Sequence, residues 1–270
     1  MIGVDLAFAR QRLTIGLSDL PSSLIVMKKE LRDSFLSLRA YTMAMVAFVG
    51  ISFFMWIQTE IPMGTNPIVE MVVALLSLLA LFYAVVFSMD SVVSEKATRT
   101  LPLIKTAPIS SASLVLGKYA AILVTWGAIL LTSLLYFLLG GRGLVGEVAL
   151  DKLVLGYVST ILLASAMSSV AIFISSVSSS VKSSAMGSLG VLFAFMGISV
   201  ARQLFSGFES VMQILNFVRN FSLIRYSSMI TEQLFQGGNG LYLGVAGLLA
   251  YSALFVVGAI CVVGLKEDVA

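Results

Sequence analysis

Long apolar stretches without a charged side chain dominate this chain of 270 residues, and residues 71–86 and 120–139 are the clearest examples. A helix needs about 20 apolar residues to cross the hydrocarbon core of a bilayer. The stretches are continuously apolar and do not alternate, as the strands of a membrane barrel would. The sequence therefore predicts a protein that crosses a membrane as helices.

Six stretches of this kind follow one another, at residues 40–58, 68–89, 119–139, 153–177, 185–201 and 241–265. Each except the fifth is comfortably long enough to span a bilayer, and the fifth is marginal. Six spans place both ends of the chain on the same side. The expected fold class is an all-α, polytopic membrane protein with one transmembrane domain over residues 40–270, preceded by amphipathic helices over residues 1–39.

The composition excludes an ordinary soluble enzyme. Hydrophobic residues make up 59% of the chain and charged residues only 11%, whereas soluble domains are about 45–50% apolar and about 25% charged. The chain has no histidine, and its single Cys261 rules out an intrachain disulfide and a cysteine-based metal site. We expect no catalytic, cofactor-binding or metal-binding residue in this chain, and we predict the lipid bilayer rather than nucleic acid as its surroundings.

The first 39 residues are typical of amphipathic helices. A first helix is expected to stop at Pro21, and a second to begin near Ser22 or Ser23, which are reasonable N-caps. Apolar residues recur at helical spacing on one face of the second helix, at Leu24, Met27, Leu31, Phe35 and Leu38. The other face is charged and contains Lys28, Lys29, Arg32 and Asp33. Such a helix suits the membrane surface, and a solvated segment that leads into the first span fits the same pattern.

The distribution of basic residues predicts the orientation of the spans. With the N-terminus in the cytoplasm, twelve of the 17 lysines and arginines fall in cytoplasmic segments. The other five are Arg142, Lys152, Arg202, Arg219 and Arg225. Cytoplasmic segments of membrane proteins are enriched in lysine and arginine. We therefore expect a multi-pass protein of the cell (plasma) membrane with both termini, and residues 96–118, in the cytoplasm.

The sequence contains no evident energy source. The third to sixth predicted spans contain no Asp, Glu, Lys, Arg or His, whereas ion-coupled transporters usually keep ionisable residues at membrane depth. Glu70 and Asp90 lie at the two ends of the second span, where the simplest interpretation is an interfacial charge. A phosphate-binding loop of the form G-x-x-x-x-G-K-[ST] is also missing. Either the protein is passive, or another polypeptide drives it.

The segment between the second and third spans, residues 90–118, combines charges with two prolines. We expect a charged helix that extends the second span and then a break at Pro102 and Pro108. Ser110 or Ser111 is expected to cap the helix that becomes the third span. A rigid, charged bend between two membrane helices is a segment on which a cytosolic partner can exert force. The alternative is an ordinary basic loop, which has the same composition.

This segment resembles the hallmark of ABC-2 type transporter permeases. In that family a glutamate precedes a Gly-Thr-Leu-x-x-Leu-Leu-x-Thr-Pro-[IV]-Ser-Arg stretch, and a Gly-Lys pair opens the third span. The matching residues here are Glu95, Thr100, Leu101, Leu103, Ile104, Thr106, Pro108, Ile109, Ser110, Gly117 and Lys118. The chain departs from the pattern at Arg99, Ala107 and Ser111. The six spans and the amphipathic helix at residues 24–39 also match the plan of the family.

The resemblance implies the permease subunit of an ATP-binding cassette exporter. In this family two permease subunits pair, as a homodimer or a heterodimer, above two ATPase domains. Glu95 would face the ATPase, and the turn that transmits its motion would contain Arg99, Thr100, Leu101 and Pro108. The flanking interface helix would contribute Lys28, Lys29 and Arg32. Because this chain has no ATPase domain of its own, the resemblance implies a separate ATPase subunit that binds ATP and Mg²⁺.

Three other regions complete the expected architecture. The fifth span carries small residues at Gly187, Gly190, Ala194 and Gly197, which let helices approach closely, either within the chain or as a sliding or dimerising surface. The serine-rich residues 175–184 are expected to form the short turn between the fourth and fifth spans. Residues 207–240 suit the short re-entrant outer helices that the family places before its last span, or an amphipathic helix on the membrane surface.

We therefore predict a permease that exports a substrate with energy from a partner ATPase. The alternative is a membrane scaffold or assembly factor that uses the same helices structurally. A membrane-embedded enzyme fits less well, because no polar constellation at membrane depth suggests catalysis. A neighbouring reading frame that encodes an ATPase with a phosphate-binding loop would favour transport over the scaffold.

The predicted topology can be tested by labelling single cysteines in cells. In a chain with Cys261 replaced by serine, Lys105→Cys should react only with a membrane-permeant reagent, because residues 96–118 are expected in the cytoplasm. Arg142→Cys, in a predicted outer segment, is the control and should react with an impermeant reagent. External labelling at position 105 would contradict the predicted orientation.

Overall fold

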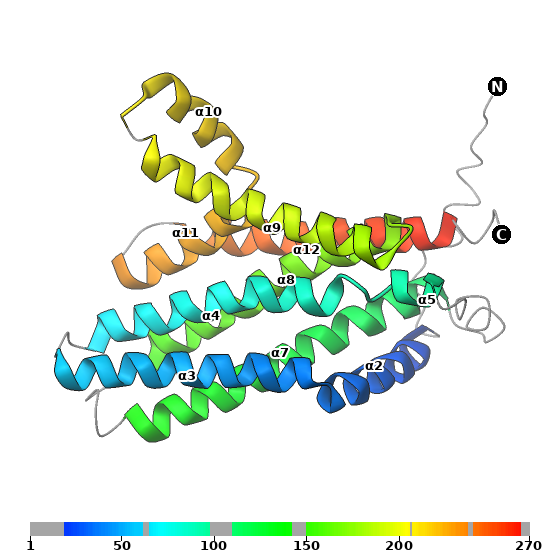
Figure 1. Cartoon of the computed structure of the whole chain (residues 1–270), viewed down its shortest axis with the longest axis horizontal. Coiled ribbons are helices and arrows are strands. Elements are labelled where there is room, and N and C mark those ends of the chain that lie inside the picture. The colour runs from blue at the N-terminus through cyan, green and yellow to red at the C-terminus, as the bar shows by residue number, and fades with distance from the viewer. Residues whose placement is uncertain are drawn as a thin grey trace.

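The computed structural model of the chain describes residues 19–61, 65–97, 110–141, 150–205, 207–236 and 240–265. Every regular element in these ranges is an α-helix. Six of the helices are long and apolar enough to cross a membrane. The expected all-α, polytopic membrane fold is therefore confirmed (Figure 1).

The six long helices run back and forth through the molecule in chain order (Figure 1). They are α3 (Leu38–Glu60), α4 (Thr65–Ser88), α7 (Ser111–Gly141), α8 (Leu150–Val177), α9 (Val181–Leu204) and α12 (Leu241–Leu265). The largest difference from expectation is that α7 begins about two turns before residue 119. Ser110 caps this earlier start, since the backbone N–H of Ser113 donates to the Ser110 Oγ at 3.1 Å. The predicted cap is thus confirmed, and Gly117 and Lys118 lie inside the helix.

α8 is the central helix of the bundle. It packs most extensively against α12 and α4 and also contacts α7, α9 and α11. Of the residues in its membrane-spanning stretch 72% are buried, compared with 17% for α9. Its buried residues include many small ones, among them Gly156, Ala164, Ser165, Ala166, Ser168, Ser169 and Ala171. Small side chains allow membrane helices to approach closely, which is how helices pack where lipid supplies no hydrophobic drive.

Polar side chains of α8 find partners inside the bundle. The hydroxyl groups of Ser159 and Ser169 donate to carbonyl groups one turn back in their own helix, at 2.7 Å in each case. Ser165 instead joins three helices, because its Oγ lies 2.9 Å from the Oγ of Ser252 in α12 and also hydrogen-bonds the hydroxyl of Tyr119 in α7. These bonds satisfy polar groups that the packing of the helices buries.

An aromatic cluster joins α4 to α7 near the end of α4. The Tyr83 ring stacks on Phe87 with centroids 4.3 Å apart and contacts the Trp126 ring at 4.8 Å. The Tyr83 hydroxyl donates to the carbonyl of Ile122 at 2.8 Å. Tyr83 and Trp126 are fully buried. The cluster therefore fixes the last turns of α4 against α7.

Two shorter helices lie at the end of the bundle where α4 finishes and α7 begins (Figure 1). They are α2 (Asp19–Leu36) and α5 (Val93–Ala97). α2 begins at Asp19, so the expectation that a helix starts at Ser22 or Ser23, after a stop at Pro21, is wrong. Proline is tolerated in the first turn because the N–H groups there have no partner within the helix. The predicted helix upstream of residue 19 lies outside the described residues.

The opposite end of the bundle carries α10 (Glu209–Arg219) and α11 (Leu223–Gln236). They have 11 and 14 residues, too few to cross a bilayer. α11 packs on α12 and α8, while α10 contacts α9 and projects away from the rest of the bundle (Figure 1). Most of the segment expected to form short helices before the last span therefore does so.

Gly156 offers a test of the central packing. A Cβ atom at this position would lie 2.4 Å from the Cγ2 and 3.2 Å from the Cγ1 of Val73 in α4. Because a valine in a helix has one strongly preferred rotamer, we expect Gly156→Ala to destabilise the chain by about 1–3 kcal/mol. The measurement is the temperature at which the detergent-purified chain loses its monodisperse elution.

The matched control is Gly127→Ala in α7. A Cβ there would meet no atom within 4 Å, so alanine should leave the stability unchanged or raise it through its higher helix propensity. If both variants behave like the parent protein, the close approach of α4 and α8 is wrong.

Candidate functional site

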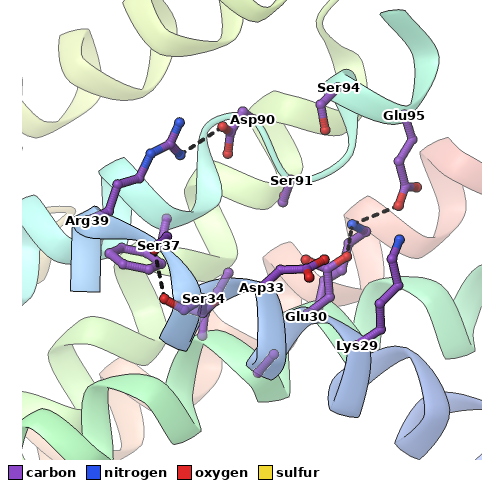
Figure 2. A pocket seen from close by; sticks show the side chains of 14 residues that line it. Lys29, Glu30, Asp33, Ser34, Ser37, Arg39, Asp90, Ser91, Ser94 and Glu95 are labelled. Atoms are coloured by element: carbon purple, nitrogen blue, oxygen red, sulfur yellow. Dashed lines mark hydrogen bonds and ion pairs between the residues drawn. The ribbon is translucent and has the colours of Figure 1, made fainter. Parts of the chain in front are cut away.

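A buried lysine joins three helices at the end of the bundle that carries α2 and α5. The Lys118 side chain in α7 is only 4% exposed, and its Nζ lies 2.7 Å from the Glu30 Oε1 of α2 and 2.8 Å from the Glu95 Oε1 of α5. Figure 2 shows Glu30 and Glu95 converging on this point from their separate helices. We call Lys118, Glu30 and Glu95 the Lys118 triad.

The two carboxylates make this position possible for an ammonium group. A buried charge without a partner is strongly unfavourable, and a buried ion pair needs good geometry to offset desolvation. Here one ammonium meets two carboxylates at hydrogen-bonding distance. The positions of α2 and α5 relative to α7 are therefore tied to a single side chain.

Gly117, the residue before this lysine, sets the distance between α2 and α7. A Cβ atom at Gly117 would lie 2.7 Å from the Val26 Cβ and 2.8 Å from the carbonyl oxygen of Ser23 in α2. Because a backbone oxygen cannot rotate away, any larger residue would push α2 off α7. The Gly-Lys pair thus combines a close helix approach with the charge that fastens it.

Serines fasten the other side of α5. Residues 89–92 form a turn between α4 and α5, and the backbone N–H groups of Val92 and Val93 both donate to the Ser175 Oγ of α8 at 3.1 Å. The Lys96 Nζ donates to the carbonyl of Ser176. The Ser184 hydroxyl of α9 donates to the carbonyl of Met89. α5 and its turn are therefore held by α7, α8 and α9 at once.

The serine-rich segment has a second role that its composition did not reveal. The expected turn between α8 and α9 is confirmed, and Ser180 caps α9 in a reciprocal capping box with Ser183. The contacts of Ser175 and Ser184 with the backbone at the start of α5 and in the turn before it were missed. A run of serines indicates a turn, but it does not indicate which distant backbone groups the hydroxyls will meet.

An open cleft of about 380 Å³ lies between α2, the α4–α5 turn and α7. Its charged lining residues are Lys29, Glu30, Asp33, Arg39, Asp90, Glu95 and Lys118. At one end the Arg39 guanidinium donates to the Asp90 Oδ2 at 2.9 Å, as Figure 2 shows. Carboxylates outnumber cations in this lining by one. Asp90 is thus an ion-paired residue at the mouth of a cleft, whereas Glu70 is exposed near the start of α4.

The structure describes only one of the residues predicted to form the coupling turn. Glu95 is buried within the chain, and the rest of the predicted coupling turn lies outside the described residues, namely Arg99, Thr100, Leu101 and Pro108. The three basic residues of the interface helix are exposed on α2, namely Lys28, Lys29 and Arg32. Glu30 was missed, since it lies among the basic residues of α2 and its partner lies 88 residues further along the chain.

The small residues of α9 divide into two groups. A Cβ atom on Gly187 would lie 3.0 Å from the Ile174 Cγ2 of α8, whereas one on Gly190 or Gly197 would meet nothing within 4 Å. Ala194 is exposed. Of the four, only Gly187 allows a close helix approach within the described chain.

The fold and the Lys118 triad define a polytopic helical membrane protein with a buried ion-paired cluster at one end of the bundle. The family profile described as ABC-2 family transporter protein matches residues 24–265. This match covers most of the chain, so the protein belongs to the ABC-2 transporter family. Family membership supports a permease component of an ABC transporter and implies an ABC ATPase as its partner. Among curated proteins, none matches the chain significantly in sequence.

The triad predicts a large effect of Lys118→Gln on stability. Removing the ammonium leaves two neighbouring carboxylates without their shared counter-charge, and breaking such a buried pair costs about 3–5 kcal/mol. Because the Glu30 side chain is 26% exposed, we expect the lower end of this range. The measurement is the thermal stability of the purified chain in detergent.

Arg39→Gln is the control for this experiment. The Arg39 side chain is 51% exposed in its pair with Asp90, and exposed ion pairs contribute at most about 1 kcal/mol. Equal losses of stability in the two variants would show that the Lys118 triad is no stronger than a surface pair.

Proposed function

We propose that this protein is the permease subunit of an exporter and that a separate ATPase subunit drives it. The observation that carries the proposal is the Lys118 triad, which connects the glutamate-bearing helix α5 to the membrane helices. In the resemblance on which the proposal builds, this helix faces the ATPase. ATP and Mg²⁺ would then bind to the ATPase subunit, and this chain would convert their chemistry into movement of its spans.

The contacts of α5 support such a role. A force applied to α5 acts on α7 through Glu95 and Lys118, and on α2 through the second carboxylate of the triad, Glu30. The same force acts on α8 through Ser175 and on α9 through the bond from Ser184 to the turn. Charge-assisted hydrogen bonds are roughly twice as strong as neutral ones. The triad is therefore the strongest of these contacts between α5 and the rest of the bundle. A displacement of α5 therefore moves several spans together.

The open cleft lies at the end of the bundle that carries α2 and α5. This supports that end as the side on which the ATPase docks. The basic residues on α2 and the acidic residues of the cleft offer both signs of charge within one small area. The predicted excess of basic residues on this side favours the cytoplasm, where ATP is available. Both termini in the cytoplasm and a position in the plasma membrane belong to this proposal.

A second permease subunit would pack against α9. The exposed face of α9 combines large and small residues, in the order Met186, Gly190, Phe193, Ala194, Gly197, Val200 and Leu204. The equally exposed α3 presents large side chains, among them Tyr41, Met45, Val49, Phe53 and Trp56. Lipid tails suit a surface of large apolar side chains, whereas small residues permit another helix to approach closely. This contrast favours α9 over α3 as the surface for a second copy or a related chain.

A membrane scaffold is the competing function. It would use the same bundle but would need no link between α5 and the spans. An ATPase with a phosphate-binding loop, encoded in the neighbouring reading frame and purifying with this chain, would support the transporter. ATP hydrolysis by this chain alone, after contaminants are removed, would contradict the separate ATPase.

Glu95→Gln tests the coupling role directly. The neutral side chain keeps the size of glutamate but loses the charge-assisted contacts, which contribute about 1.5–3 kcal/mol each. We expect the variant to insert normally and to lower permease-stimulated ATPase activity about tenfold. The measurement is the ATPase rate of the complex with its partner in proteoliposomes, relative to the partner alone.

Two variants control for stability and for charge. Glu30→Gln removes the other carboxylate that faces Lys118, so it tests whether loss of any triad bond is enough. Glu70→Gln removes an exposed carboxylate far from the triad and should leave the rate unchanged. If Glu95→Gln keeps the rate as high as Glu70→Gln does, α5 is not the coupling element; a loss in Glu30→Gln as well would show that the coupling passes through the whole triad.

A further inference from the structure

The open cleft beside the Lys118 triad lies at the level where two membrane spans end. Its lining includes Arg39, the second residue of α3, and Phe87, the last residue but one of α4. Phospholipid headgroups form the layer directly outside the hydrocarbon core of a bilayer. The cleft is therefore placed at the depth of the headgroups.

Two exposed leucines border the cleft where α2 meets α3. Ser37 joins the two helices in an extended conformation, and both Ser37 and Arg39 line the cleft. Their neighbours in the chain, Leu36 and Leu38, are 73% and 81% exposed. Beside a membrane span, side chains this apolar are stable in contact with acyl chains and unfavourable in water. A polar wall and a surface for acyl chains thus meet at this junction.

The accessible charges of the cleft have both signs. Lys29 and Asp33 are exposed on α2, and neither forms an ion pair within the described part of the chain. Figure 2 shows Asp33 on the wall formed by α2 and Asp90 on the opposite wall. Arg39 donates to Asp90 through Nη1, and a guanidinium group has further donors on Nη2 and Nε. The cleft therefore offers donors to an anion and a carboxylate to a cation.

The charge balance favours a ligand that carries an ammonium group. In the Lys118 triad one ammonium faces two carboxylates, and carboxylates outnumber cations by one over the whole lining. An anionic headgroup would add to this excess of negative charge, whereas a zwitterionic headgroup adds no net charge. A primary ammonium group also donates three hydrogen bonds, which a quaternary ammonium group cannot do.

The size and the floor of the cleft suit such a headgroup. The volume of about 380 Å³ lies in the range of small-molecule sites, which is roughly 300–1,000 Å³. Apolar side chains of α4 and α7 form part of the lining, namely Phe87, Ala121 and Ile122. Sites of this kind combine apolar walls with a few polar groups that orient the ligand.

We propose that the cleft binds phosphatidylethanolamine, a phospholipid with a phosphate and a primary ammonium group. Lys29 and Arg39 donate to the phosphate, Asp33 accepts from the ammonium, and the acyl chains lie along Leu36 and Leu38. These contacts lie outside the Lys118 triad, so the proposal does not depend on the coupling to an ATPase.

The test is lipid binding by the full chain in detergent, measured by native mass spectrometry. The probes are phosphatidylethanolamine and phosphatidylcholine with identical acyl chains in equal amounts. The parent chain should prefer phosphatidylethanolamine, and Asp33→Asn should lower this preference about fivefold, which is the upper effect of an exposed ion pair. Lys29→Gln should weaken the binding of both lipids alike, because both carry the phosphate. Leu38→Ser should also weaken both alike, because acyl chains do not distinguish headgroups.

Matched controls exist for both charge changes. Lys28→Gln removes the exposed cation next to Lys29 but lies outside the lining of the cleft, and Asp151→Asn removes an exposed aspartate at the start of α8. Both variants should bind the two lipids as the parent does. The proposal is overturned if the parent does not prefer phosphatidylethanolamine, if Asp33→Asn keeps the preference, or if Lys28→Gln weakens binding as much as Lys29→Gln.

Two further outcomes would assign the cleft to another occupant. If soluble phosphoethanolamine saturates the cleft at the same concentrations as the lipid, the acyl chains contribute nothing and the lipid is not the ligand. If the parent shows no lipid preference but Asp33→Asn no longer retains the partner ATPase, the cleft binds a cationic side chain of that subunit. Either result overturns the proposal.

Discussion

A single buried ammonium group determines how one end of this molecule is arranged. Lys118 enters the bundle two turns after α7 begins, and it is stable there because Glu30 and Glu95 reach it from two other helices. The charge can stay buried only while both α2 and α5 remain in place. Gly117 makes the arrangement sterically possible, since it lets the backbone of α2 approach α7 closely.

Neutral hydrogen bonds hold α5 in place together with the ion pairs. The Ser175 hydroxyl accepts two successive backbone N–H groups at the start of α5, which would otherwise lack partners at a helix N-terminus. Ionic strength affects the exposed Arg39–Asp90 pair much more than these bonds. This end of the bundle therefore combines contacts that differ in their response to salt. When salt weakens the Arg39–Asp90 pair, the bonds to Ser175 still hold the turn between α4 and α5.

The sequence was sufficient to predict the membrane spans, but it was not sufficient to predict the contacts between their ends. Uncharged apolar length predicts a membrane helix with few alternatives, and all six predicted spans correspond to long helices. Local patterns are less reliable at helix starts: Pro21 predicts the end of a helix, but it lies in the first turn of α2, where proline is tolerated. The partners of Lys118 could not be predicted, because Glu30 lies 88 residues away in the chain and only the fold brings the two together. Likewise, spacing alone could not show that Gly187 meets α8 while Gly190 and Gly197 face away from the chain.

The order of the triad along the chain has a consequence for how the protein is made. Glu30 and Glu95 both precede Lys118 in the sequence, so a ribosome synthesises the two carboxylates before the ammonium that they neutralise. When α7 leaves the translation machinery for the membrane, α2, α4 and α5 have already been made. The lysine can thus be paired as its own helix inserts, and it never has to wait in the bilayer for a counter-charge from a later part of the chain.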